Sequence, residues 1–194
     1  MEYHNPVLLH ASVDGLNIKP DGVYVDVTFG GGGHSKEILS RLGPNGKLFA
    51  FDQDEDALAN TLDDERFTLI NENFRFIKRF LRFYGIKSVD GILGDLGVSS
   101  HQFDVPERGF STRFDADLDM RMSQKNDLNA YRVVNEYDNA NLTRVFLDYG
   151  ELKNAPALAR TIIEAREYES IKTTDELKEV LAKYLPEKVR NKVL

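Results

Sequence analysis

Residues 24–35 have the sequence YVDVTFGGGGHS, in which a short apolar run ends in the carboxylate of Asp26 before four glycines lead into a predicted helix. Glycine adopts positive φ angles without strain and lets the backbone touch a ligand with no Cβ between them. Doubly wound α/β proteins bind nucleotide-like cofactors at such a strand, glycine turn and helix. The alternative is a flexible glycine loop that binds nothing.

A second acidic strand end favours the cofactor site. The predicted strand at 47–52 runs into Asp52 and Asp54, and Asp52 lies 20 residues after Gly32. That spacing is close to the one at which an acid meets a ribose diol in dinucleotide sites. Either acid also fits the N-cap of the helix that begins near Glu55. We expect Asp54 to cap this helix and Asp52 to accept hydrogen bonds from the ribose hydroxyls.

The residues around the turn narrow the choice of cofactor. Ser35 stands where the dinucleotide pattern G-x-G-x-x-G has its last glycine or alanine, and no Gly-Lys-Ser/Thr of a phosphate loop follows. S-adenosylmethionine has a ribose and no phosphates, so its site needs the acid and the close backbone without a phosphate cradle. The sequence therefore favours a methyltransferase over a dehydrogenase.

Composition is that of an ordinary globular chain. Of its 194 residues 41% are hydrophobic and 29% are charged, and no apolar run approaches the ~18 residues of a membrane span. The absence of cysteine excludes disulfides and thiolate chemistry and, with no apolar leader at the N-terminus, predicts a cytoplasmic enzyme. The net charge of −7 argues against broad nucleic-acid binding but allows a local basic patch.

The order of predicted elements divides the chain in two. Strands are expected near residues 23–28, 47–52, 67–71 and 89–94, and helices near 34–42, 55–62 and 74–84. This alternation predicts a doubly wound, Rossmann-like parallel sheet. Only helices are expected later, near 127–135, 139–149, 155–166, 173–184 and 186–194, with caps from Asn139 or Asn141 and from Thr173 or Thr174, and a stop at Gly150.

Three further motifs point to one family. They are HNPVLL at 4–9, GDLGVSSHQ at 94–102 and RGFSTRFDADLDMRM at 108–122. With the glycine turn, they closely resemble the bacterial MraW family, which methylates N4 of a cytidine in the decoding centre of small-subunit ribosomal RNA. The resemblance covers residue 3 to the end. It implies the class I methyltransferase fold, S-adenosylmethionine as cofactor, and 16S rRNA within the small ribosomal subunit as partner.

The resemblance also implies a domain division and site residues. Residues 1–105 would be the S-adenosylmethionine-binding domain, and 106–194 a connecting loop with an inserted all-helical substrate-recognition domain. The expected cofactor-binding residues are Gly32, Gly33, His34, Asp52, Phe74, Asp95 and Gln102. We expect Asn5 and Arg108 to contact the substrate. Phe74 would flank the adenine, although it could equally begin the core of the following helix.

Asp95 is the expected catalytic residue. Cytosine N4 is a poor nucleophile because its lone pair is delocalised into the ring. Amino-methyltransferases orient such an amine with polar groups after the fourth strand, where this chain has Asp95-Leu96-Gly97-Val98. Acceptors there would localise and aim the lone pair. Asp95 could serve the cofactor, the amine, or both.

The expected strand order is 3-2-1-4, in the class I methyltransferase manner. The family's polypeptide is longer, and its later part returns to finish the sheet. We therefore expect this chain to be a fragment with a truncated sheet. The exposed edge of the strand at 89–94 would then be covered by a homodimer or by helices from 140–194. The alternatives are a methyltransferase of the same fold acting on a small molecule or protein, and an inactive cofactor-binding fragment.

Other charged residues have open interpretations. Asp115, Asp117 and Asp119 resemble the start of a calcium loop, but Met120 and Asn126 occupy its glycine and glutamate positions, so no metal is expected. Arg108, Arg113 and Arg121 would either neutralise RNA or pair with these acids, and pairing is favoured for Arg121. A solvated face is favoured over RNA contact for the helical residues Lys78, Arg79 and Arg82.

Overall fold

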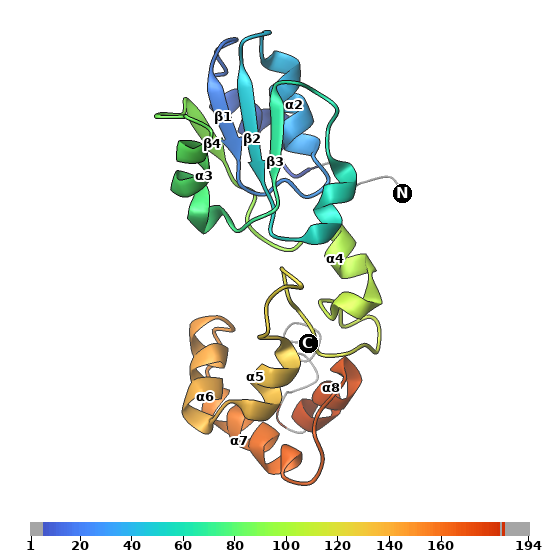
Figure 1. Cartoon of the computed structure of the whole chain (residues 1–194). Coiled ribbons are helices and arrows are strands. Elements are labelled where there is room, and N and C mark those ends of the chain that lie inside the picture. The colour runs from blue at the N-terminus through green and yellow to red at the C-terminus, as the bar shows by residue number, and fades with distance from the viewer. Residues whose placement is uncertain (1–5, 183, 185–194) are drawn as a thin grey trace. The chain divides into compact units, whose positions relative to one another are not determined.

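The computed structural model describes residues 6–182 and 184. They form two compact units, which we describe separately (Figure 1). Within the described residues the first unit extends to Ser100 and includes residues 122–124, and the second comprises residues 101–121 and those from Lys125 onward. The domain division expected from sequence falls after residue 105.

A four-stranded parallel sheet forms the first unit. Its order is β3-β2-β1-β4, so β3 and β4 are its edges. The strands are β1 (Val23–Asp26), β2 (Lys47–Phe51), β3 (Phe67–Ile70) and β4 (Gly91–Leu93). In register, Val25 of β1 lies between Phe49 and Ile92. The carboxyl ends of all four strands meet at one edge of the sheet, and the α/β class and the expected strand order are confirmed (Figure 1).

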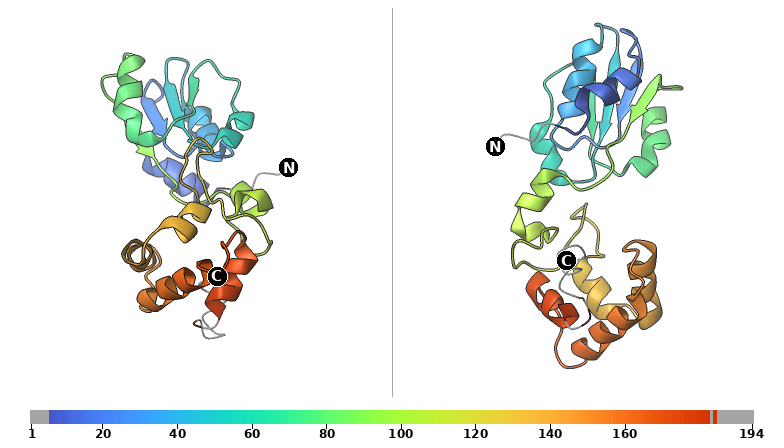
Figure 2. Two further views of the ribbon diagram at one scale, coloured as in Figure 1. Left: turned by 60° about the horizontal axis from the view of Figure 1, so that its bottom comes forward. Right: turned by 180° about the vertical axis from the view of Figure 1, so that it is seen from behind.

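Alternation along the strands creates two apolar faces. On one face Tyr24 and Leu48 pack against α1 (Leu9–Gly15) and α2 (Gly33–Arg41). On the other, Val25, Phe49 and Phe51 pack against α3 (Ile77–Phe83). Side chains at consecutive strand positions point to opposite faces, so each strand supplies both cores. Figure 2 shows α1 and α2 lying over the sheet in the view from behind.

Several elements differ from the expectation. The predicted helix at 55–62 is a short 3₁₀ helix, η1 (Glu55–Asn60), and the one at 74–84 is a 3₁₀ turn, η2 (Phe74–Phe76), followed by α3. Helix α1 was not predicted. Its N-cap residue makes no side-chain hydrogen bond to the helix, so the usual sequence signal for a helix start is missing. Strands β1 and β4 are also shorter than expected.

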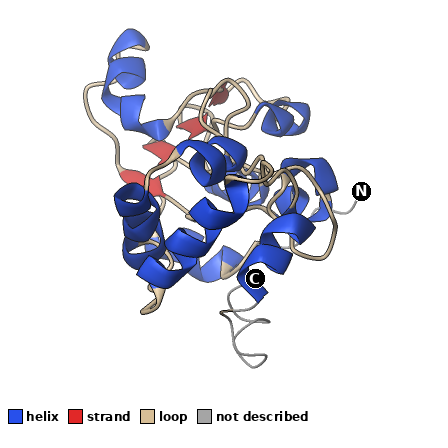
Figure 3. Ribbon diagram, turned by 90° about the horizontal axis from the view of Figure 1, so that it is seen from below, coloured by secondary structure: helices blue, strands red, loops and turns tan. Residues whose placement is uncertain are grey.

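Helices dominate the second unit, and every strand of the described residues lies in the first (Figure 3). After α4 (Ser100–Asp104), which spans the division, come η3 (Pro106–Arg108), α5 (Ala130–Glu136), α6 (Asn139–Asp148), α7 (Ala155–Arg166) and α8 (Thr174–Ala182). Leu142, Leu158 and Ile162 are fully buried at the centre of this unit. Among the described residues no helix is long and apolar enough to cross a membrane. The helix expected at 186–194 lies outside them.

Polar side chains cap the starts of α6 and α8 in this unit. Asp138 caps α6 by accepting a hydrogen bond from the Asn141 amide, so the expected cap at Asn139 or Asn141 was wrong. At α8 the Thr173 hydroxyl accepts from the Glu176 amide at 3.3 Å, while the Glu176 carboxylate accepts from the Thr173 amide. This reciprocal pair of hydrogen bonds is a capping box, and it confirms Thr173 as the cap of α8, which begins at Thr174.

Leu142 gives a stability test of the helical unit. Leu142→Ala should lower the free energy of unfolding by about 2–5 kcal/mol, because its buried side chain would be replaced by a cavity. Leu147→Ala, on the same helix but 44% exposed, should cost well under half as much. Urea unfolding of both variants measures the difference, and equal losses would contradict the described packing of α6.

Candidate functional site

The glycine turn lies between β1 and α2. Gly30 and Gly32 have positive φ angles of 49° and 76°, which other residues rarely adopt. A Cβ on Gly30 would meet nothing within 4 Å, so this part of the backbone is open to a ligand. A Cβ on Gly33 would lie 2.3 Å from the Cγ of Pro6, so Gly33 is required for contact with the N-terminal segment.

A buried carboxylate holds the turn. Asp26 is fully buried at the end of β1 and accepts hydrogen bonds from the Ser35 hydroxyl at 2.7 Å and the Thr28 amide at 3.0 Å. Ser35 belongs to α2, so Asp26 connects both sides of the turn. Burial raises the pKa of Asp26, and the hydrogen bonds from Ser35 and Thr28 act in the opposite direction.

Asp52 lies beside the turn at the end of β2. One carboxylate oxygen accepts a hydrogen bond from the Gly30 amide at 2.7 Å, and the other accepts from the Asp54 amide at 2.9 Å. Asp54 in turn accepts from the Asp56 amide and caps η1, so the cap expected at Asp54 is confirmed. Asp52 therefore joins the glycine turn to the loop after the second strand. That it holds a ribose stays a prediction.

Amide side chains connect the neighbouring loops. Asn60 of η1 donates to the Gly30 carbonyl at 3.0 Å. Asn71, just after β3, donates to the carbonyls of Asp52 and Asp54 at 3.0 and 3.2 Å. Sequence reasoning assigned no such role to Asn60 or Asn71. In the sequence, each is only an amide residue next to the end of a strand or helix, and such residues are too common to predict a particular contact.

Thr28 links the first strand to the fourth. Its hydroxyl accepts a hydrogen bond from the Asp95 amide at 2.7 Å and lies 3.5 Å from Asp26. The Val27 amide also donates to the Leu93 carbonyl, which continues β1 against the end of β4. The main chain of Asp95 is thereby fixed while Asp95 itself is exposed beyond its strand. The Asp52 carboxylate thus contacts the glycine turn at Gly30, and the Asp95 main chain contacts Thr28 just before it, from the two strands that flank β1.

The expected cofactor residues His34 and Phe74 lie at this edge of the sheet. His34 is 6% exposed, and its Nε2 has no hydrogen-bond partner within the described residues. A buried polar atom of this kind is costly unless something else satisfies it. Phe74 is 40% exposed and belongs to none of the described core clusters, so it does not begin the core of the following helix.

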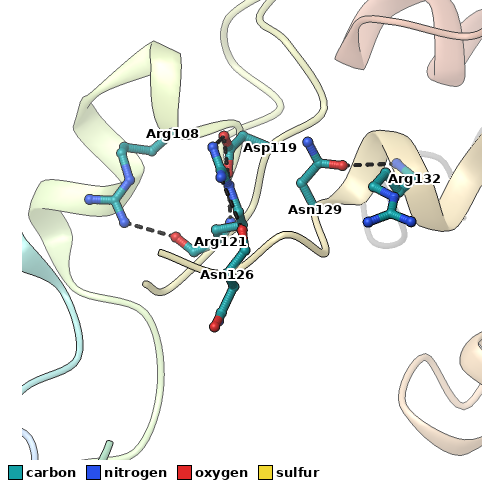
Figure 4. Close-up of polar contacts among 6 residues, drawn as sticks. All are labelled: Arg108, Asp119, Arg121, Asn126, Asn129 and Arg132. Carbon is teal, nitrogen blue, oxygen red and sulfur yellow. Dashed lines mark hydrogen bonds and ion pairs between the residues drawn. The ribbon is translucent and has the colours of Figure 1, made fainter. Parts of the chain in front are cut away.

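Of the residues expected to bind cofactor or substrate, Gln102 and Arg108 belong to the second unit, and Asn5 is not described. Gln102 lies in α4 and is buried. Arg108 is also buried, and its Nη2 donates to the Arg121 carbonyl at 2.9 Å (Figure 4). Its guanidinium is therefore part of the packing of this segment, and its expected contact with substrate stays a prediction. Asn5 lies outside the described residues.

Arg121 and Asp119 form an ion pair within the acidic segment at 115–121. Arg121 forms a two-pronged contact with Asp119 and donates to the Asn126 carbonyl, which confirms the pairing favoured for Arg121 (Figure 4). Arg113 pairs with Asp104 at 2.8 Å and not with the acids of this segment. Within residues 6–182 and 184, no three His, Asp or Glu side chains form a group that could hold a metal ion.

The raised pKa of Asp26 predicts a pH-dependent stability. Between the ordinary value of 3.8 and the raised pKa, the folded protein binds more protons at this carboxyl than the unfolded chain. Ionisation of Asp26 therefore lowers stability as the pH rises through that window. Asp26→Asn removes this carboxyl, so the stability of the wild type relative to the variant should fall from pH 4 upward.

Urea unfolding at several pH values measures this difference. Asp21→Asn, at an exposed position, is the control for the loss of one carboxylate. A difference between the wild type and Asp26→Asn that grows with rising pH in favour of the wild type would contradict the assignment of Asp26 as a buried, destabilised carboxylate.

Comparison with known proteins gives a consistent family assignment. A model of the MraW methylase family matches residues 1–194. A Flavobacterium johnsoniae protein named ribosomal RNA small subunit methyltransferase H is 87% identical over 194 residues, 100% of this chain and 64% of that protein. Proteins of the same name from Flavobacterium psychrophilum and Bacteroides thetaiotaomicron are 75% and 56% identical, over 96% and 93% of this chain and 64% and 60% of their own lengths.

The chain thus spans less than two thirds of the length of these relatives, while the alignment with the first of them covers all of its residues. The family model likewise matches from the first residue to the last. The parallel sheet of order β3-β2-β1-β4 is in keeping with a methyltransferase-like fold. On these findings the chain belongs to the MraW methylase family.

Proposed function

We propose that this chain binds S-adenosylmethionine and takes part in methylating N4 of a cytidine in the decoding centre of 16S rRNA, within the small ribosomal subunit. One observation carries the proposal: on the two sides of β1, the Asp52 carboxylate accepts a hydrogen bond from the Gly30 amide of the glycine turn, and the Asp95 amide donates to the Thr28 hydroxyl just before that turn. Membership of the MraW methylase family and relatives named as rRNA methyltransferases support the rRNA substrate.

The residues at the carboxyl edge fit this cofactor. A carboxylate can accept about four hydrogen bonds, so Asp52 can hold the ribose hydroxyls while it accepts from backbone amides. The open backbone at Gly30 allows close approach, and the buried Nε2 of His34 offers a polar contact that no described residue makes. The exposed ring of Phe74 can flank the adenine. The cofactor contact expected for Gln102, which belongs to the second unit, stays a prediction.

Asp95 would act on the target amine. S-adenosylmethionine supplies an electrophilic methyl group, and the N4 lone pair must be aimed at it. A carboxylate that accepts a hydrogen bond from the amine localises this lone pair and orients it. Because the Thr28 hydroxyl fixes the Asp95 main chain, the carboxylate extends from a defined position. The main-chain carbonyls of Leu96–Val98 are the next candidates for the second amine hydrogen.

Transfer of a labelled methyl group tests the proposed substrate. Small ribosomal subunits, naked 16S rRNA and pools of small molecules and proteins are compared as acceptors, with the Flavobacterium johnsoniae relative as reference. Labelling of N4 of one cytidine in the rRNA supports the proposal. Labelling of a small molecule or protein would favour a methyltransferase that acts on another substrate. Cofactor binding without methyl transfer would favour an inactive cofactor-binding fragment. The homodimer and the cytoplasmic location stay predictions.

Asp52→Ala should weaken S-adenosylmethionine binding by about 1.5–3 kcal/mol, the range for hydrogen bonds to a charged group. Asp52→Asn should lose less, because the amide oxygen can still accept from the Gly30 amide. Isothermal titration calorimetry measures both. Glu55→Ala, which changes an exposed acid at the start of η1, is the matched control. Unchanged affinity in a folded Asp52→Ala variant would remove Asp52 from the cofactor site.

Asp95→Ala should lower turnover at saturating cofactor at least tenfold, about 1.4 kcal/mol in the barrier, because the amine loses its orienting acceptor. Asp63→Ala, an exposed acid outside the site, is the control and should retain the wild-type rate. Single-turnover methylation at several cofactor concentrations separates rate from affinity. A normal saturated rate would confine Asp95 to cofactor binding.

A further inference from the structure

The stretch from Asn73 to Val89 has a charge unlike the rest of the chain. It contains five basic residues and no acidic residue, in a protein with 25 basic and 32 acidic residues. The five are Arg75, Lys78, Arg79, Arg82 and Lys87, and all are exposed. A local excess of positive charge on an acidic protein attracts polyanions to one place.

Helix α3 carries Lys78, Arg79 and Arg82 on its exposed side, with Arg75 in η2 just before it and Lys87 just after it. Its inner face is fixed by Ile77, Phe80 and Leu81, which pack on the core beneath the sheet, with Phe80 against Phe51 at 6.0 Å between ring centroids. Lys78, Arg79 and Arg82 lie three, four and seven positions after Arg75, the spacing of one helix face. The packing of α3 therefore turns a continuous basic stripe to solvent.

These five side chains differ from most other basic residues in having no acidic partner. None of them forms an ion pair with an acid in the described part of the chain. On other helices charged residues of opposite sign pair with each other, as Arg41 does with Glu37 on α2 and Arg132 with Glu136 on α5. An ordinary solvated helix face in this protein is therefore of mixed charge, and α3 is not.

An exposed aromatic ring accompanies the basic stripe. Phe83 at the end of α3 is 79% exposed and lies edge-on to Tyr84, with 5.2 Å between ring centroids. Tyr84 contacts Phe49 of the sheet, so it supports Phe83 from the core side. Cationic side chains beside an exposed aromatic ring are the combination with which proteins bind single-stranded nucleic acid, through phosphates and base stacking.

We propose that this surface, the five basic residues together with Phe83, docks ribosomal RNA. The basic residues contact phosphates, and Phe83 stacks on an unpaired base. The stripe begins at Arg75, directly after Phe74 at the carboxyl edge of the sheet, so RNA bound along α3 can reach that edge. The inference rests on the proposed function only for the identity of the RNA, because the contacts themselves require no methyl transfer.

A charge-reversed variant tests the surface against a matched control. K78E/R79E/R82E changes three residues of the stripe, and K47E/K153E/R160E makes the same charge change at three exposed residues elsewhere. Binding to naked 16S rRNA is measured by filter retention between 50 and 200 mM salt, without cofactor. The stripe variant should bind at least tenfold more weakly than the control, and its salt slope should fall by about 2 to 3.

Three further measurements keep the test decisive. K78Q/R79Q/R82Q removes the charges without reversing them and should also lose binding, while Phe83→Ala should weaken binding to single-stranded rRNA segments at least fivefold. Circular dichroism verifies the fold of each variant. Calorimetry with S-adenosylmethionine should give wild-type affinity for all of them, which separates this surface from the cofactor site and from any failure of methyl transfer.

Several results would overturn the proposal. They are a wild type that does not bind rRNA, equal losses in the stripe and control variants, and wild-type binding by the folded stripe variants. A stripe variant that still binds naked rRNA but not small ribosomal subunits would identify a ribosomal protein as the partner and exclude RNA docking.

Discussion

The hydrogen bonds of the buried Asp26 carboxylate hold the candidate site together. A carboxylate without solvent is costly unless donors surround it, and here the donors are the Ser35 hydroxyl of α2 and the Thr28 amide before the glycine turn. These two hydrogen bonds therefore favour the observed arrangement of the turn. Thr28 extends this constraint to the fourth strand, because its hydroxyl accepts from the Asp95 amide.

Groups that would meet a ligand are thus already positioned by the protein. Asp52 is oriented by the Gly30 and Asp54 amides, and Asn71 fixes the main chain of Asp52. Binding then requires little reorganisation, and that is the main way in which proteins gain rate from electrostatic groups. The same contacts explain why a carboxylate is suited to position 52, where it can serve backbone amides and ligand hydroxyls together.

The sequence was sufficient where a residue has a strong local signal. The four strands and the Asp54 cap followed from apolar runs, turn glycines and capping chemistry, whereas the strand order followed from the common order of class I methyltransferases. It was insufficient where contacts join distant residues, as for Asn60 with Gly30, 30 positions apart. Arg108 shows the same limit, since its burial depends on the Arg121 carbonyl, and no local pattern reveals that a charged side chain lies inside.

The acidity of the chain and its basic stripe on α3 have one electrostatic explanation. A net charge of −7 repels phosphate over most of the surface and keeps non-specific RNA binding weak. Five cations that no acid in the described residues neutralises then create a local region of positive electrostatic potential, which attracts a polyanion. In the proposed docking, the acidic background would disfavour RNA contact elsewhere on the described surface, so repulsion there would help to orient the RNA together with the attraction at α3. A uniformly basic protein would bind RNA more tightly but in many orientations, few of which would bring a base to the carboxyl edge of the sheet.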